Sequence, residues 1–284
     1  MIRRLFSATL AAFLTVNVQA AFTFTPKENN KVGLYLGGEI WQSEASGVFG
    51  EKNTLIDFNL KKEQQINYFI AVVHPFPLLP NVRISSSILE TTGKTNLTQE
   101  FSFSGETFSI DDDINANFNV NYIDYTFYYE LFDNGLFLFD LGLTARDFNG
   151  AVTVKGPAVI DYGDGNCNDP DPPPEITCPS PSSSTTPTGK IKTDDIEPML
   201  YVATSVNLPL KRLSVFAQGD FSLINNHSLY DYKVGLSYGL INSRMLNFNM
   251  TLGYRVVKIQ FEDLNNLYTN LEFKGVFVGV ITHF

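Results

Sequence analysis

The 284-residue sequence has little positive charge and few of the residues that carry catalysis or bind metals. Its 20 Lys and Arg face 30 Asp and Glu, and the net charge of −10 argues against a nucleic-acid partner, because phosphate binding needs clustered basic residues. Only three His, two Cys and one Trp are present. Beyond the first twenty residues no run approaches the roughly 18 apolar residues of a membrane-spanning helix. Membrane helices are therefore not expected.

Aromatic residues are abundant, with 24 Phe and 13 Tyr. Hydrophobic residues make up 44% of the chain and charged residues 18%, so the composition is too apolar for a disordered chain. The mean hydropathy of −0.03 is too mild for a bundle of membrane helices. Together these values favour a β-rich protein, and the length allows one large β domain.

The first twenty residues have the organisation of a secretory signal peptide. Arg3 and Arg4 precede an apolar stretch over 5–16, and small residues stand at Val18 and Ala20. A positive start, a short apolar region and small residues before the cleavage point are typical of such peptides. We expect cleavage after Ala20, export of the chain, and one folded domain over 21–284.

Strict alternation of apolar and polar residues recurs in segments of about 10 to 14 residues, and the segment 228–241 is the clearest case. One of its faces carries Tyr230, Tyr232, Val234, Leu236, Tyr238 and Leu240. The opposite face carries Asp231, Lys233, Gly235, Ser237 and Gly239. Similar patterns occupy 32–40, 123–131, 136–148, 213–223 and 244–259. Each segment therefore predicts a β-strand with one apolar and one polar face.

Two architectures use such strands: a soluble sandwich that packs its apolar faces together, and a membrane barrel that turns them to lipid. The strand length matches the tilted residues needed to cross hydrocarbon. Tyrosines near strand ends fit an interfacial aromatic belt, and Gly, Ser, Thr and Asn on the polar faces fit a crowded lumen. The sequence favours the barrel.

Short and long connections alternate along the chain. The short ones lie at 75–80, 133–134, 209–212 and 241–243, and the others at 42–65, 92–116, 149–195, 225–227 and 261–267. Outer-membrane barrels show this asymmetry between short periplasmic turns and long extracellular loops. We therefore predict an all-β, transmembrane antiparallel barrel of about ten strands, an even number that leaves no open edge.

The C-terminal residues also alternate. Val276, Val278, Val280 and the terminal Phe284 share one face of a strand, as in the C-terminal signal that the outer-membrane barrel assembly machinery reads. Thr282 departs from the larger apolar residue that is more usual at its position. This strand predicts the assembly machinery as a partner during biogenesis and the bacterial outer membrane as the location.

Several fragments resemble a family of small Gram-negative outer-membrane β-barrel proteins of unassigned function. They are 74–81, 128–134, 141–143 with Arg146, 253–255, and 274–275 through 283–284. Each fragment is a turn or part of a strand, and none is a reaction signature. The resemblance implies the fold and the location, and it transfers no site.

Ten charged residues fall on the polar faces and are expected inside the barrel: Glu39, Arg83, Asp124, Glu130, Asp140, Arg146, Asp220, Asp231, Lys233 and Arg255. Isolated charges are costly to desolvate, so we expect these side chains to pair. Because eight strands leave room only for side chains and 16 to 18 leave a channel, ten should leave at most a narrow water path. We expect little or no stable conductance.

The connection 149–195 contains both cysteines, Cys167 and Cys178, which we expect to form a disulfide in an oxidising compartment. The same connection offers oxygen ligands for calcium at Asp161, Asp164, Asn166, Asp169 and Asp171. The run lacks the terminal bidentate Glu of an EF-hand loop, and the favoured interpretation is an acidic, disulfide-closed surface loop. No metal or cofactor is predicted with any strength.

Catalytic signals are weak. His227 and the run Asp111–Asp113 fall in predicted extracellular loops, where omptin-type surface proteases use carboxylates and a His as general base. The paired Asp-x-His arrangement of those proteases is absent, because Asp220 stands seven residues before His227. Ser228 lacks a third partner for acyl transfer. We expect no catalysis.

The sequence predicts a monomeric outer-membrane barrel with a structural or surface-interaction role through its extracellular loops. Its expected partners are outer-membrane lipid and lipopolysaccharide. The alternative is a narrow, porin-like channel for small solutes, and an omptin-like protease is the third hypothesis. Bilayer conductance separates the first two.

Overall fold

A computed structural model describes residues 32–52, 54–76, 78–161, 183–209, 212–224, 228–243 and 246–284. All of them belong to one compact unit, Lys31–Phe284. The predicted signal peptide over 1–20 lies outside the described residues. In the described part of the chain, no helix is long and apolar enough to cross a membrane.

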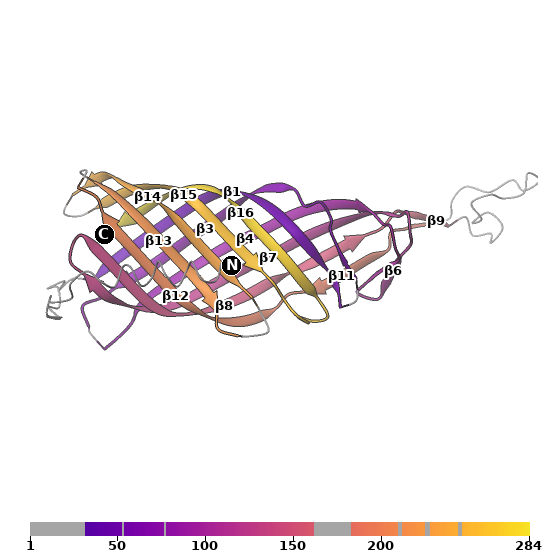
Figure 1. Ribbon diagram of the computed structural model, residues 1–284, viewed down its shortest axis with the longest axis horizontal. Helices are drawn as coiled ribbons and strands as arrows, with labels where there is room; N and C mark the ends of the chain where they lie inside the picture. Colours follow the sequence, from indigo (N-terminus) through magenta and orange to yellow (C-terminus); the bar gives the residue numbers. More distant parts are fainter. Residues whose placement is uncertain are drawn as a thin grey trace, which may run out of the picture. The chain divides into compact units, whose positions relative to one another are not determined.

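Ten long antiparallel strands form a closed barrel, which confirms the predicted fold class (Figure 1). They are β1 (Gly33–Glu51), β3 (Lys62–Val73), β4 (Asn81–Asn96), β7 (Asp113–Asp133), β8 (Phe137–Lys155), β12 (Asp195–Asn207), β13 (Leu213–Ser222), β14 (Tyr230–Asn242), β15 (Asn247–Ile259) and β16 (Tyr268–His283). Each pairs with its neighbours in sequence order, and β1 pairs with β16 from Tyr35↔His283 to Gly50↔Tyr268. The sheet therefore has no open edge.

Six short strands belong to the long connections. Strand β2 (Thr54–Ile56) pairs with β1, and β11 (Thr188–Lys192) pairs with β8. Two small hairpins follow, β5 (Phe101–Phe103) with β6 (Glu106–Phe108), and β9 (Val159–Asp161) with β10 (Ser183–Thr185). Figure 1 shows β6, β9 and β11 at one end of the barrel and the C-terminus toward the other. We call these the long-loop end and the short-turn end.

The turn between β7 and β8 illustrates how the sequence closes the short-turn end. Gly135 has a φ of 79°, a left-handed conformation that favours glycine. The Asp133 Oδ1 accepts a hydrogen bond from the Gly135 N–H at 2.7 Å, and the Asn134 Oδ1 accepts from the Phe137 N–H at 2.7 Å. These side chains satisfy the turn's own backbone donors, so two long strands reverse within a few residues.

Polarity inverts along the strands, and β7 shows it best. Toward the short-turn end its outward residues are apolar: Ile123, Tyr125, Phe127 and Tyr129 are 39 to 50% exposed. Toward the long-loop end, by contrast, its inward residues are apolar and buried, namely Ile114, Ala116, Phe118, Val120 and Tyr122. The outward residues there are Asn115, Asn117, Asn119 and Asn121. One half of the strand is apolar outside and the other half is apolar inside.

The strands are consequently longer than the sequence pattern predicted. The alternation predicted 10 to 14 residues, whereas β7 has 21 residues and β1 and β8 have 19 each. Parts of the segments assigned to the connections 42–65, 92–116 and 149–195 are therefore strand: β1 runs to Glu51, β4 to Asn96 and β8 to Lys155. The inversion explains the difference, because a strand whose apolar face switches sides no longer follows one alternation pattern.

Candidate functional site

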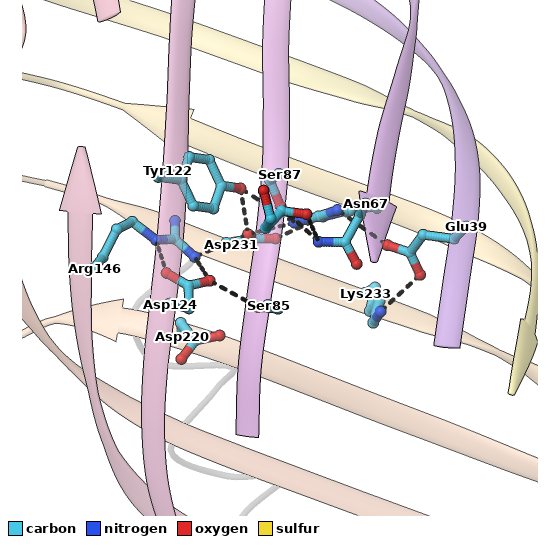
Figure 2. Close-up of polar contacts among 12 residues, drawn as sticks. Glu39, Asn67, Ser85, Ser87, Tyr122, Asp124, Arg146, Asp220, Asp231 and Lys233 are labelled. Carbon is cyan, nitrogen blue, oxygen red and sulfur yellow. Dashed lines mark hydrogen bonds and ion pairs between the residues drawn. The ribbon is translucent and has the colours of Figure 1, made fainter. Parts of the chain in front are cut away.

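Six charged side chains meet inside the barrel, and we call them the ionic network (Figure 2). Each sits at an inward position of its strand and is at most 9% exposed. They are Glu39 of β1, Asp124 of β7, Arg146 of β8, Asp231 and Lys233 of β14, and Arg255 of β15. The structure thus brings together six of the ten charges that the alternation assigned to the lumen.

Arg146 links β8 to β7 and β14. Its Nε and Nη2 donate to the two carboxylate oxygens of Asp124 at 2.7 and 2.9 Å, in the fork geometry that matches guanidinium to carboxylate. The same Nη2 donates to Asp231 Oδ2 at 3.1 Å. The guanidinium lies over the ring of Tyr122, 3.9 Å from its centroid. Stacking and two carboxylates therefore fix this buried cation.

Arg255 is the centre of the network. Its Nε and Nη2 donate to Asp231 at 2.9 and 2.7 Å, and its Nη1 donates to Glu39 Oε1 at 3.0 Å. The other oxygen of Glu39 accepts from Lys233 Nζ at 2.7 Å. Asp231 and Glu39 are therefore each shared by two cations.

Neutral groups complete the hydrogen bonding. The Tyr122 hydroxyl donates to Asp231 Oδ2 at 2.8 Å and accepts from Arg255 Nη2 at 3.1 Å. Ser87 Oγ accepts from Arg255 at 3.2 Å, and Asn67 Nδ2 donates to the same Oγ at 2.6 Å. The network therefore reaches across the lumen from β3 and β4 to β14 and β15.

The charges of the ionic network cancel, since three cations face three carboxylates. Burying an unpaired charge costs several kcal/mol, whereas this set leaves every member with an oppositely charged partner. The six members of the network therefore offer no unmatched charge to a passing ion. Its chemistry is that of a barrier and a brace between strands.

An aromatic core fills the lumen on the long-loop side of the network. Phe49 stacks on Phe58 with ring centroids 4.5 Å apart, and the β5–β6 hairpin adds its own rings. Its buried aromatic residues include Trp41, Phe49, Phe58, Phe101, Phe103, Phe108, Phe118, Phe148, Phe261 and Phe273. The sequence reasoning expected a polar lumen throughout and missed this core. The inward alternation of Ile114, Ala116 and Phe118 was the signal that could have revealed it.

Four predicted lumen charges lie outside the network. Asp220 accepts a hydrogen bond from Thr144 Oγ1 at 2.6 Å and is 5% exposed. Arg83 and Asp140 line a cavity on the short-turn side. Glu130 is opposite Asp140 in the β7–β8 pairing and is exposed at that end of the barrel.

The outer surface near the long-loop end carries a polar groove of about 500 Å³. Asparagines of β7 and β8 form one wall, and Lys190 and Lys192 of β11 lie at the other. We call this the asparagine groove; its side-chain members are Asn117, Asn119, Asn121, Asn149, Thr153, Lys190, Lys192 and Asp194. In the described part of the chain neither lysine ammonium has an ion-pair partner.

The acidic run at 111–113 has local structural partners. Asp112 Oδ2 accepts from the Ser109 N–H at 2.8 Å. Lys94 Nζ and Asn96 Nδ2 donate to Asp113 at 2.8 and 3.2 Å, and these hydrogen bonds hold the pKa of Asp113 below its usual value. The carboxylates thus organise the start of β7.

The C-terminal strand presents its alternating valines outward. Val276, Val278 and Val280 are 58, 45 and 42% exposed, and Phe284 is 54% exposed. β16 pairs with β15 on one side and β1 on the other, so it closes the barrel.

Several predicted site residues lie outside the described residues. They are Cys167, Cys178 and His227, with the calcium candidates Asp164, Asn166, Asp169 and Asp171; the fifth, Asp161, ends β9. The disulfide, the calcium site and the absence of catalysis all stay predictions. Among the residues that the structure describes, no group of three or more His, Cys, Asp or Glu could hold a metal ion.

No protein-family model and no curated sequence matches the chain. Similar solved structures include the outer membrane protease OmpT of Escherichia coli, with 9% identity, a TM-score of 0.45, and coverage of 93% of this chain and 99% of OmpT. The attachment protein Ail of Yersinia pestis has 10% identity, a TM-score of 0.29 and coverages of 89 and 99%. A Pseudomonas aeruginosa FadL homologue has 8% identity, a TM-score of 0.31 and coverages of 90 and 90%. At such values no activity carries over.

Proposed function

We propose that this protein is a non-conducting outer-membrane barrel that displays a folded, ligand-binding extension on the cell surface. The observation that carries the proposal is the pair of barriers in its lumen, the ionic network followed by the aromatic core. A closed lumen disfavours transport. The surface of the long-loop end is then the part of the molecule that would bind a ligand.

The apolar outer belt supports membrane insertion. Large apolar side chains such as Ile40, Ile66, Phe127, Leu252 and Val276 are 49 to 58% exposed around the short-turn half of the barrel. Soluble proteins rarely expose contiguous apolar surface on this scale. The belt thus fits lipid, with the short turns in the periplasm and the long loops outside the cell.

Strand length supports an extension beyond the membrane. At about 3.3 Å per residue and a tilt near 40°, the 21 residues of β7 advance roughly 50 Å along the barrel axis, about twice a 25 Å apolar band. The polar outer face and the aromatic interior of the long-loop half fit a water-exposed extension with its own core.

Planar-bilayer recording tests the closed lumen. The purified protein is expected to give no stable single-channel steps, because ions must cross the paired charges of the ionic network and the buried aromatic core. Large, steady steps from the folded protein would overturn this part of the proposal. Folding of each preparation is checked by heat-modifiable mobility in gels.

The side chains of the asparagine groove indicate which class of ligand the extension would bind. Amide side chains suit sugar hydroxyls, and the ammonium groups of Lys190 and Lys192 suit phosphates. The groove lies on the outer wall next to the apolar belt, where phosphorylated saccharides of lipopolysaccharide would meet it. We therefore assign lipopolysaccharide headgroups as its ligand.

Binding to purified lipopolysaccharide tests this assignment. K190Q/K192Q should weaken binding about tenfold or more and reduce its salt dependence, because two phosphate partners are lost. The matched control is K62Q/K94Q, which removes two exposed lysines that already pair with Glu44 and Asp113. Equal losses in both double variants would contradict a role for the groove.

A further inference from the structure

The lumen on the short-turn side of the ionic network contains a cavity of about 200 Å³. Its walls combine aromatic and aliphatic side chains with polar groups, the combination typical of small-molecule sites. Its lining residues include Phe69, Arg83, Leu138, Asp140, Phe216 and Thr251. We call it the lumen pocket.

Arg83 enters this pocket as a cation without an acceptor. Its guanidinium lies over Phe69, 3.5 Å from the ring centroid, and among the described residues no carboxylate or carbonyl accepts a hydrogen bond from it. Gly37 makes room for that ring, because a Cβ there would overlap Phe69. The Phe69 ring holds the Arg83 guanidinium in place, and the N–H groups of the guanidinium stay available to a ligand.

Asp140 contributes the opposite charge. Its Oδ1 is buried and has no hydrogen-bond partner among the described residues. Its register neighbours are Glu130 on β7 and Ala203 on β12, and neither supplies a donor side chain. A buried carboxylate oxygen without a donor is uncommon and costly, so such an atom points to a missing partner.

Arg83 and Asp140 line the same pocket and do not form an ion pair with each other. In the ionic network, by contrast, every charge is paired. The pocket thus keeps one donor group and one acceptor group unmatched, and its lining also includes the apolar side chains of Leu138 and Phe216. A ligand that carries both an anionic and a cationic group would complete the two together.

A second cavity lies on the short-turn side of the lumen pocket along β15. Asn249 lines a second cavity of about 370 Å³, Thr251 lines the lumen pocket, and Arg255 belongs to the ionic network. All three are inward positions of the same strand, two or four residues apart. Along β15, the lumen pocket therefore lies between the ionic network and the cavity at the short turns.

We propose that the lumen pocket binds a small zwitterion of amino-acid size, whose carboxylate pairs with Arg83 and whose ammonium pairs with Asp140. An apolar cavity of about 150 Å³ accommodates benzene, so the lumen pocket has room for a small organic molecule such as a free amino acid with an aliphatic side chain. The site is independent of the asparagine groove and of conductance.

Calorimetric titration of the full-length protein in lipid nanodiscs tests the proposal with three probes. L-leucine carries both charges, 4-methylpentanoate lacks the ammonium, and 3-methylbutylamine lacks the carboxylate. Leucine should bind at least about tenfold more tightly than either analogue, the difference expected from one lost charge-assisted hydrogen bond.

Two variants assign the partners. R83Q should weaken leucine and 4-methylpentanoate about tenfold or more and leave 3-methylbutylamine unchanged, whereas D140N should weaken leucine and 3-methylbutylamine only. K94Q, at the opposite end of β4, serves as the control and should bind as the unmodified protein does. Heat-modifiable mobility confirms that each variant has folded.

Three results would overturn the proposal. One is no saturable heat with leucine up to about 10 mM, well above a millimolar Kd. Another is binding of 4-methylpentanoate as tight as that of leucine, which would define an anion site instead. The third is leucine affinity unchanged in both folded variants.

Discussion

At the scale of single residues, Arg255 connects the largest number of buried groups. It donates to Asp231, Glu39, Ser87 and Tyr122, which come from four strands. A cation held this way is hard to remove alone, because its carboxylates stay behind without compensation. The ion pairs also indicate which acidic and basic residues can be replaced together without leaving an unpaired charge.

The double variant D231A/R255A is the balanced removal. It leaves Arg146 with Asp124 and Lys233 with Glu39, so every remaining charge keeps a partner. R255A alone should lower the free energy of unfolding in lipid vesicles by about 3–5 kcal/mol, and the double variant by clearly less than the sum of the two single changes. Urea titration measures all three.

The control for this cycle is an exposed pair. Lys62 and Glu44 lie 3.1 Å apart, with side chains 63 and 55% exposed. K62A should change the free energy of unfolding by no more than about 1 kcal/mol. Additive effects of D231A and R255A would refute the network as a coupled unit.

The Tyr122 hydroxyl allows a finer change. Y122F removes one donor to Asp231 and one acceptor for Arg255 while it keeps the ring below Arg146. The expected loss is about 1.5–3 kcal/mol, the value for hydrogen bonds to charged groups. Y129F, which removes an exposed bond to the Leu78 carbonyl, should cost less than about 1 kcal/mol in the same titration.

At the scale of elements, β7 shows what determines predictability. Its short-turn half was predicted because Ile123, Tyr125 and Phe127 alternate with Asp124 and Thr126 over one clear face. In its other half, residues 113–116 are part of the predicted connection and 117–122 fall in no predicted strand, because asparagines are poor strand formers and the apolar residues have moved to the inner face. Alternation identifies the apolar face of a strand, and it does not reveal whether that face contacts lipid or the barrel interior.

The candidate site was predictable to the same degree. Alternation placed Glu39 and Lys233 on inward faces, and the structure joins them at 2.7 Å across 194 residues of sequence. Which charges meet depends on the stagger between strands, which no local pattern contains. Thus Arg83 and Asp140 looked like the other lumen charges, although they form no ion pair.

The inversion along β7 predicts a labelling boundary. In a background with both native cysteines changed to Ser, single Cys residues at Asn117 and Asn119 should react with a water-soluble maleimide in reconstituted liposomes. Single Cys residues at Tyr125 and Phe127 should stay unlabelled, because lipid covers those outward positions. Equal labelling of all four sites would contradict a membrane boundary between Asn119 and Tyr125.

At the scale of the whole molecule, two barriers lie in series along the lumen. The first is electrostatic, the ionic network, and the second is apolar, the aromatic core with the β5–β6 hairpin. On the proposed function, a path for ions opens only when both layers are breached. We therefore expect the closed state to tolerate damage to either layer.

Conductance measurements on three variants test this redundancy. Replacement of residues 98–110 by a short Gly-Ser linker removes Phe101, Phe103 and Phe108 from the core, and D231A/R255A thins the network. Each change alone should leave the planar bilayer silent, and the combination should produce channel openings. Openings from either single change would show that one layer alone keeps the lumen shut.

The only tryptophan of the chain, Trp41, lies where the two layers meet. It is 1% exposed, and Arg255 lies 5.2 Å from its ring. Its fluorescence therefore reports on the barrel interior and not on lipid, unlike the interfacial tryptophans of many membrane proteins. Brominated acyl chains should barely quench it in the folded protein, so the chain contains its own optical reporter of barrel closure.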